Sequence, residues 1–392
     1  MRLADLDTYD MSRERGFLCR HDAAQVELEG ELAEVGRIAL RLPEFLPSGE
    51  VRRLLDRALP EPVSPAAIER LDDAQARLAM VHYSFMVQSY IWGEDEVTAR
   101  LPASLAVPIV ALADRLGRQP LLQYEDYVLN NWAKLDARGA VTLDNIHMIQ
   151  KFAGGLDEAW FVLVHVAIEA RAGDALALFG PIVEAAAKGD RARLTELLEG
   201  LVDVWADINA IFGRMTEKCD PHIYFRRVRP YIHGWKDNPA VKDGILYEGV
   251  ARYQNLPQVF RGQTGSQSSI VPSMDALLGV GHAADPLKSY LDELHAYRPP
   301  AHRRFIEDVR TNSRLRAFVD AERGKGLVAA YNGVVEAVAA FRTLHLEYAA
   351  SYINKQGGRS AGNDTEVGTG GTPFMKYLKK HRDETRANLI EA

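Results

Sequence analysis

Apolar residues recur at spacings of three and four along most of the chain, and this period constrains the fold more than any other feature. Such spacing places apolar side chains on one face of an α-helix. The sequence has no run of alternating β-branched residues bounded by hairpin turns, and no strand-helix-strand rhythm that would indicate a parallel sheet. It therefore predicts an all-α fold.

Breaks rich in proline and glycine separate two helical blocks. Residues 1–105 contain short helical candidates divided by LPEFLPSGE and PEPVSP, and they predict a small N-terminal helical domain. Residues 106–392 contain longer candidates and predict a large helical bundle domain. The expected helices that bear on the argument below cover 64–88, 124–135, 156–172, 175–187, 190–215, 299–312 and 326–353.

Composition excludes several classes of protein. The 392 residues include 47 Lys and Arg against 54 Asp and Glu, so the formal net charge is −7 and a strongly basic nucleic-acid binder is disfavoured. Two cysteines, Cys19 and Cys219, are too few for a disulfide scaffold or a structural zinc site. The longest apolar run, Ala159–Ile168, is too short to span a membrane. We expect a cytoplasmic protein that binds neither nucleic acid nor membrane.

The segment 357–373, GGRSAGNDTEVGTGGTP, is rich in glycine, serine and threonine, which is typical of a mobile loop. Its GTGGT run (368–372) does not follow a strand and lacks the lysine of a phosphate loop, so nucleotide binding is rejected. Two interpretations stay open: a flexible lid and a plain surface linker.

The expected helix 326–353 carries a stripe on one face that contains a histidine. Steps of four, three, four, three and four residues join Val334, Val338, Phe341, His345, Tyr348 and Tyr352. An imidazole on such a face points to the interior, where its nitrogens need partners. His345 is then either a core histidine bonded within the protein or an axial ligand of haem iron.

A second interior histidine lies on an apolar helix, AWFVLVHVAIEA (159–170). His165 is one helical turn from Phe161 and has the same two interpretations. Two interior histidines without a surplus of carboxylates at metal-ligand spacing suggest opposite sides of one cofactor. The chain has no Glu-x-x-His pair, so the di-iron bundle signature is absent.

A third cluster, YFRRVRP (224–230), places two aromatic residues beside three arginines. Phe225 and Arg229 are four residues apart and share a helix face. The arginines either form a solvated face or direct one guanidinium inward, where two of its N–H groups would bind a carboxylate.

Several segments resemble, in order and spacing, the indoleamine 2,3-dioxygenase family. They are LAVPIVALADRLGRQPLLQYEDYVLNNW (105–132), YIHGWKDNPAVKDGILYEGV (231–250), GQTGSQSSIVPSMDALLGV (262–280), RPPAHRRFIEDV (298–309), FRTLHLEYAASYI (341–353) and GTGGTPFMKYLKKHRDET (368–385). The resemblance implies a small and a large helical domain with haem b. It also implies that ferrous haem (Fe2+) inserts both atoms of the co-substrate O2 across the indole C2–C3 bond of tryptophan, giving N-formylkynurenine.

The resemblance also implies roles for individual residues. His345 would be the proximal iron ligand, Arg342 a haem-propionate partner and Arg229 the arginine that binds the substrate carboxylate. His165 would accept a hydrogen bond from the indole N–H; it stands where this family typically has serine and the sister tryptophan 2,3-dioxygenases have histidine. The remaining residues expected around the substrate are Tyr124, Tyr127, Val128, Phe161, Tyr224, Phe225, Gln263, Thr264, Gly265 and Thr369.

Two other functions stay open at this point. One is a haem oxygenase of the same fold that acts on another indole derivative in secondary metabolism, and the other is a non-catalytic haem sensor. Tyr224 replaces an expected phenylalanine, and GQTGSQSS differs from the family's usual turn, so both features bear on substrate choice. We expect a small indole as substrate, an unknown reductant, and a monomer or weak oligomer.

Overall fold

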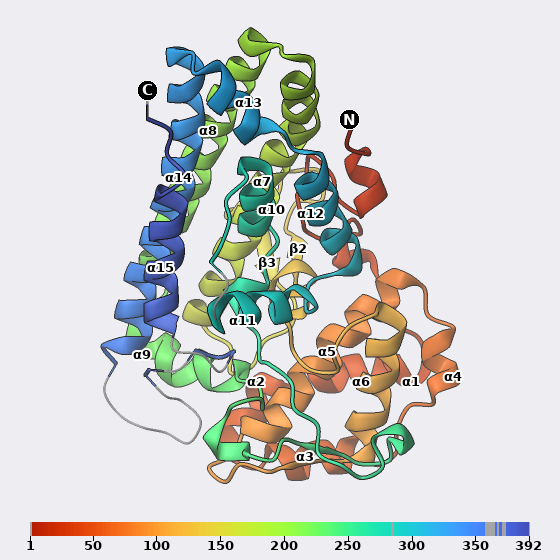
Figure 1. Ribbon diagram of the computed structural model, residues 1–392. Coiled ribbons are helices and arrows are strands. Elements are labelled where there is room, and N and C mark those ends of the chain that lie inside the picture. The colour runs from red at the N-terminus through yellow and green to blue at the C-terminus, as the bar shows by residue number, and fades with distance from the viewer. Residues whose placement is uncertain (1, 284–285, 357–364, 367, 371–373, 392) are drawn as a thin grey trace.

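The computed structural model describes residues 2–283, 286–356, 365–366, 368–370 and 374–391. Helices dominate this part of the chain (Figure 1), so the all-α prediction is confirmed. The α-helices are α1 (Gly30–Ala39), α2 (Leu42–Phe45), α3 (Val51–Ala58), α4 (Pro65–Glu69), α5 (Asp73–Trp92), α6 (Ala103–Leu116), α7 (Leu156–Lys188), α8 (Arg191–Gly213), α9 (Pro221–Ile223), α10 (Ile270–Leu278), α11 (Pro286–His295), α12 (Pro300–Asn312), α13 (Leu315–Glu322), α14 (Lys325–Ala349) and α15 (Phe374–Arg386).

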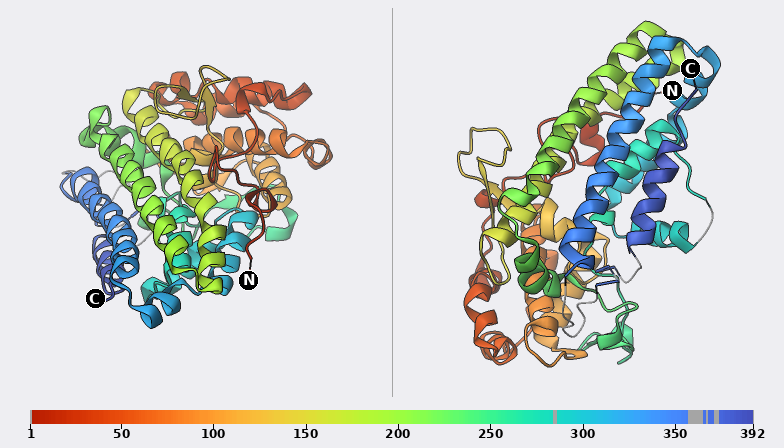
Figure 2. Two further views of the ribbon diagram at one scale, coloured as in Figure 1. Left: turned by 90° about the horizontal axis from the view of Figure 1, so that it is seen from above. Right: turned by 90° about the vertical axis from the view of Figure 1, so that its left-hand side faces the viewer.

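The long helices form a bundle in which α8 packs against both α7 and α14, and α15 covers α14. Figure 2 shows these helices running along the length of the molecule. The stripe predicted on α14 lies in the bundle core: Val334 and Val338 are completely buried, and the Phe341 and Trp205 ring centroids are 5.7 Å apart. Burying each such side chain contributes roughly 1.5–3 kcal/mol.

The short helices gather around α5, which is buried on most of its faces. This helix begins after Asp72, whose carboxylate accepts the Gln75 N–H in a capping box. The expected helix 64–88 is therefore two helices, α4 and α5, because the cap starts a new one. Helix α6 packs on α4 and α5, so the predicted domain boundary at residue 105 falls inside a helix that packs with the N-terminal block.

In the described part of the chain, four short strands lie between the helices. Strand β1 (Arg100–Leu101) pairs in parallel with β4 (Leu246–Tyr247), and β2 (Trp132–Lys134) pairs antiparallel with β3 (Ile146–Met148). The expected helix 124–135 is wrong in its second half, where the ladder to β3 replaces it. Its first half is a π-helical turn, Glu125–Leu129.

Helix α7 is continuous where two helices, 156–172 and 175–187, were expected. Gly173 does not break it. A Cβ at this position would lie 2.2 Å from the Arg13 carbonyl oxygen, so the glycine instead lets the N-terminal turn approach the helix closely. The neighbouring Gly16 meets the Glu169 backbone in the same way.

By length and composition alone, one helical stretch in the described part of the chain could cross a membrane. It is Lys325–Asn354, with a mean hydropathy of 1.2, and half of the tested window is buried. A core helix of a soluble protein meets the same criteria, so this is weak evidence. The expected lack of membrane association stays a prediction.

Candidate active site

A cavity lies beside α7 and α14, under the turn at residues 262–269, and it has two adjoining compartments. The larger has a volume of about 980 Å³ and the smaller about 140 Å³. His165, Phe212, Gly265 and His345 line both of them. Apolar atoms form most of the wall surface, although many charged side chains also line the larger compartment. A mostly apolar surface with a few polar groups is typical of a site for a small molecule or cofactor.

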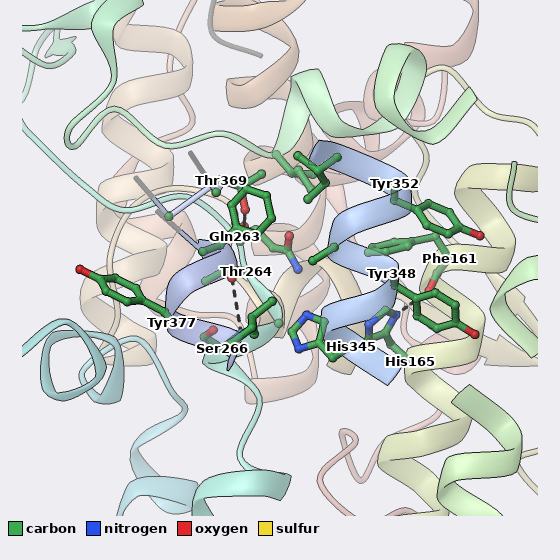
Figure 3. A pocket seen from close by; sticks show the side chains of 18 of the residues that line it. Phe161, His165, Gln263, Thr264, Ser266, His345, Tyr348, Tyr352, Thr369 and Tyr377 are labelled. Carbon is green, nitrogen blue, oxygen red and sulfur yellow. Dashed lines mark hydrogen bonds between the residues drawn. The ribbon is translucent and has the colours of Figure 1, made fainter. Parts of the chain in front are cut away.

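His345 projects from α14 into this cavity (Figure 3). Burial is the main cause that lowers the pKa of its imidazole to about 4, and His165 and Arg342 add to the effect. The ring is therefore neutral at physiological pH. No described residue forms a hydrogen bond with either ring nitrogen, which leaves a lone pair facing the cavity. This is the state in which histidine binds a metal.

His165 comes from α7 and lines the same cavity (Figure 3). Its Nδ1 lies 2.7 Å from the Phe161 carbonyl oxygen. Because a carbonyl can only accept, Nδ1 carries the hydrogen and Nε2 presents a lone pair. Burial lowers the pKa of this imidazole as well. His165 is thus a neutral hydrogen-bond acceptor inside an apolar site.

Aromatic rings hold both histidines in place. The Phe212 ring centroid is 6.1 Å from that of His165 and 6.3 Å from that of His345. Phe161 lies 4.7 Å from His165 and 4.6 Å from Tyr224, measured between ring centroids. These contacts form a continuous aromatic wall beside the two imidazoles.

A buried carboxyl group, Glu169, lies one turn beyond His165 on α7 and lines the larger compartment. The hydroxyls of Tyr124 and Ser268 both donate to its Oε1 at 2.8 Å. Its Oε2 is buried and accepts no hydrogen bond from the described residues. Burial raises the pKa of Glu169 to about 7, although the two hydroxyl bonds act in the opposite direction.

We predict that Glu169→Gln changes the pH dependence of folding stability. The folded pKa is about 7 and the ordinary value is 4.5, so the folded state binds the proton more tightly and the wild type loses stability as the pH rises between these values. The amide does not ionise. When the pH rises from 5 to 8, the free energy of unfolding of the wild type should therefore fall relative to that of the variant by up to roughly 3 kcal/mol.

Urea unfolding at the two pH values measures this shift. Glu158, whose pKa burial also raises to about 7, titrates in both proteins and cancels in the difference. Parallel pH profiles for the wild type and the variant would show that Glu169 keeps its ordinary pKa.

Most of the predicted site residues line one compartment or the other. The smaller compartment includes Phe161, Tyr224, Gln263, Thr264, Gly265 and Thr369 in addition to the two histidines, and the larger includes Tyr124 and Arg342. These residues come from α7, α14, the turn after Arg261 and the segments around Tyr124, Tyr224 and Thr369, at positions that are more than 200 apart in the sequence.

Other predicted residues lie behind the wall. Tyr127, Val128, Phe225 and Arg229 are fully buried but are not among the described residues that line either compartment. The Tyr127 ring packs against Phe161 at 6.2 Å between centroids, and the Arg229 guanidinium lies 5.5 Å from the centre of the Phe225 ring. These residues support the wall, and their direct contact with a substrate stays a prediction.

Arg342 lies on the cavity wall but is already engaged. Its guanidinium donates to Asp275 at 2.7 Å and to the His381 carbonyl at 2.9 Å, and it also contacts Thr385. A propionate at this position would share the guanidinium with Asp275. The predicted propionate role of Arg342 is therefore untested.

Only part of the segment 357–373 is described. Residues 357–364, 367 and 371–373 lie outside the described residues, and with them most of the predicted lid. The Thr369 hydroxyl donates to the Gln263 carbonyl at 2.6 Å, and the Gly370 carbonyl accepts from Arg261 at 2.7 Å. These bonds hold Thr369 and Gly370 against the smaller compartment.

Among the residues that the structure describes, three π-helical turns adjoin the site, and sequence analysis missed all of them. They span Glu125–Leu129, Tyr224–Val228 and Ala350–Asn354. Such turns are rare and often occur at functional sites. The second begins with Tyr224 and the third contains Tyr352, so both turns position aromatic side chains of the wall.

One further group of ligand-type side chains, His282, His381 and Glu384, has its donor atoms within 4.8 Å of one another. His282 contacts Glu384 through Nδ1 at 2.6 Å and Asp275 through Nε2 at 3.2 Å. Burial alone would lower the pKa of His282, but these two carboxylates outweigh it and raise the pKa. The ring bridges two carboxylates that favour its protonated form, and a metal ion is not needed to explain the cluster.

The model of the indoleamine 2,3-dioxygenase family matches residues 5–388. The chain belongs to the indoleamine 2,3-dioxygenase family. Indoleamine 2,3-dioxygenase 1 of Rattus norvegicus is 32% identical over 398 residues, which cover 98% of this chain and 96% of the relative. The resemblance stated from the sequence is thereby confirmed, and with it the assignment to a family of haem-dependent dioxygenases.

Relatives with other names are similar to this chain over most of its length. Indoleamine 2,3-dioxygenase acdA of Aspergillus candidus is 32% identical and covers 78% of this chain and 78% of its own length. A protein named myoglobin from Haliotis diversicolor is 28% identical and covers 97% of both chains. Family membership therefore assigns a haem dioxygenase, while the substrate is a separate question.

The cavity of this family member fits a haem group. Its wall is largely apolar, and it carries a neutral imidazole, His345, with no hydrogen-bond partner among the described residues. A nitrogen that faces a mostly apolar cavity without a hydrogen bond is available to a ligand that enters it. His345 would hold the iron, and Phe212, Phe341 and Leu378 would contact the porphyrin.

Proposed function

We propose that this chain inserts both atoms of O2 across the indole C2–C3 bond of L-tryptophan and forms N-formylkynurenine. The observation that carries the proposal is the neutral, unbonded His345 imidazole in the cavity of an indoleamine 2,3-dioxygenase family member. The haem b group, in its Fe2+ form, supplies the oxygen chemistry when it is bound.

The residues of the chain supply position and orientation. Nε2 of His165 accepts a hydrogen bond from the indole N–H, since Nδ1 is already used by the Phe161 carbonyl. Phe161 and Tyr224 confine the indole ring on one side. Holding the ring in one orientation lowers the entropic part of the barrier, and the largely apolar wall limits the access of water.

The smaller compartment also offers groups for the amino-acid end of the substrate. Thr369 lies on the wall of this compartment, and Arg229 lies behind Tyr224. Burial raises the pKa of the Tyr224 hydroxyl, and the nearby positive charge of Arg229 lowers it by a smaller amount. In this proposal the ammonium group lies near Thr369 and the carboxylate is directed toward Arg229. Charge and hydrogen bonding at this end would select an amino acid over a simple indole.

A direct experiment tests the reaction. The reduced protein loaded with haem is titrated with L-tryptophan without oxygen, ¹⁸O₂ is then admitted, and the product is analysed by mass spectrometry. We expect N-formylkynurenine that carries both labelled atoms. A product with a single labelled atom would show that the chain inserts one oxygen atom rather than two, and would overturn the dioxygenase assignment for this substrate.

A second candidate, a haem oxygenase of the same fold that acts on another indole, has specific support in the chain. His165 and Tyr224 differ from the residues that the family resemblance leads one to expect, and both line the smaller compartment. If L-tryptophan is not consumed while another indole is oxidised, the tryptophan assignment is wrong. Bound haem with no turnover of any indole would point instead to a role closer to that of a haem sensor.

The cellular setting belongs to the same proposal. We propose a cytoplasmic protein, a monomer or weak oligomer, that receives electrons from a cellular reductant not yet identified. The support is that Cys19 and Cys219 are both buried free thiols. Burial raises the pKa of each thiol to about 12, so neither is a ready nucleophile.

A further inference from the structure

Arg298 lies just before α12, on the wall of the larger compartment, and only 4% of it is exposed. Its Nε donates to the Ser268 carbonyl at 3.1 Å, and its Nη2 donates to the Ser266 carbonyl at 2.7 Å. Its Nη1 lies 3.3 Å from Nδ1 of His295. All three partners are neutral, because burial lowers the pKa of His295 to about 4.

No described carboxylate forms an ion pair with Arg298. Two other buried arginines on or near the cavity wall have such partners: Arg342 is 2.7 Å from Asp275, and Arg261 is 2.8 Å from Glu293. Burying a cation without a counter-charge is costly. In agreement, burial and the nearby charge of Arg310 lower the pKa of Arg298 to about 10.

The charges around Arg298 do not provide the missing partner. Asp275 is within electrostatic range, but Arg342 and His282 already bind it. Glu307 is paired with Arg310. The remaining N–H groups of the Arg298 guanidinium are used by none of the described acceptors, so they can bind a ligand in the compartment that Arg298 lines.

We propose that Arg298 binds a carboxylate of the molecule that occupies the larger compartment. This inference rests on the proposed function, under which that molecule is haem and the carboxylate is a propionate. The compartment suits such a ligand because most of its surface is apolar, and because Arg298 is buried on its wall without an ion pair among the described residues, whereas Arg310, Arg316 and Arg342 on the same wall are paired. A guanidinium binds a carboxylate with two parallel hydrogen bonds.

Arg298 also connects this anion site to the substrate side. Its two carbonyl partners belong to the turn that carries Gln263, Thr264 and Gly265, which lines the smaller compartment. One side chain would thus bind the propionate and hold the substrate turn. A test must separate these two roles.

The test uses the full chain, freed of haem, and two probes: ferric haem and its dimethyl ester, which lacks free carboxylates. Each probe is titrated into the wild type, Arg298→Gln and Arg298→Lys, and the Soret band is followed. We expect Arg298→Gln to weaken haem binding by about tenfold or more, since a charge-assisted pair is lost. Binding of the ester should not change.

Arg298→Lys keeps the positive charge and should retain most of the preference for free haem over the ester. Arg304→Gln is the matched control, because Arg304 is exposed on α12 and lies outside the cavity wall. If Arg298→Gln does not fold, the Arg298→Met variant replaces it in the same comparison, with thermal unfolding as the check on folding.

The other outcomes contradict the proposal in different ways. An equal loss for haem and ester would show that Arg298 only holds the turn. Unchanged binding of both probes with a raised KM for tryptophan would assign the guanidinium to the substrate carboxylate. If the wild type binds neither probe, the proposed function fails as well, so the two failures are distinguishable.

Discussion

Replacement of His345 by alanine is expected to remove haem from the protein. The imidazole is neutral, faces the cavity and has no other described partner, so it is the group available to bind iron. Loss of one axial bond worth about 3 kcal/mol lowers the affinity for haem by roughly 100-fold. The purified variant should therefore lack the Soret absorbance of the wild type.

Two further proteins make this test specific. His345→Gly leaves space for added imidazole, which should restore the Soret band. His147→Ala removes an exposed histidine on β3 and should keep it. An intact six-coordinate spectrum in His345→Ala would refute the assignment of the iron ligand.

Replacement of His165 by alanine is expected to remove the distinction between tryptophan and 1-methyltryptophan. The wild type should strongly prefer tryptophan, because the methylated indole cannot donate to Nε2 and leaves this buried acceptor unsatisfied. In a dry, rigid site this discrimination reaches as much as roughly 10⁴-fold. The measured quantity is the ratio of kcat/KM for the two substrates.

His82→Ala is the matched control for a lost buried imidazole. His82 is 4% exposed on α5, bonds to Gln150 and lines neither compartment. Its replacement should lower stability without changing the substrate ratio. The same ratio in His165→Ala as in the wild type would show that His165 does not contact the indole nitrogen.

Sequence periodicity predicted the helices of this protein well where the same packing repeats along a helix. It predicted them less well where a single contact decides whether a helix continues or ends. The stripe on α14 was predicted correctly, because its apolar side chains pack against α8 over many turns. The break at Gly173 was wrong, because the N-terminal turn needs the space of a missing Cβ. The extension of a helix into β2 was wrong, because Trp132 pairs with Met148, 16 positions away.

The site was predicted only where the residue type itself carries the chemistry. His165 and His345 stood out because the nitrogens of an imidazole in an apolar stripe need a hydrogen-bond partner or a metal ion. Glu169 and Arg298 did not stand out, since charged residues on helices are common in the sequence. Their importance comes from burial and from the charges that are missing around them, and both depend on the packing of distant segments.

The sequence by itself determined the helical class, the interior faces of the main helices and the two histidines that point inward, because each follows from the spacing of residues within one segment. Only the tertiary structure decided that both histidines line one cavity, which nitrogen of His165 is free, and that Arg298 is buried without a counter-charge. These properties depend on distances between segments far apart in the chain, and no local pattern encodes such distances.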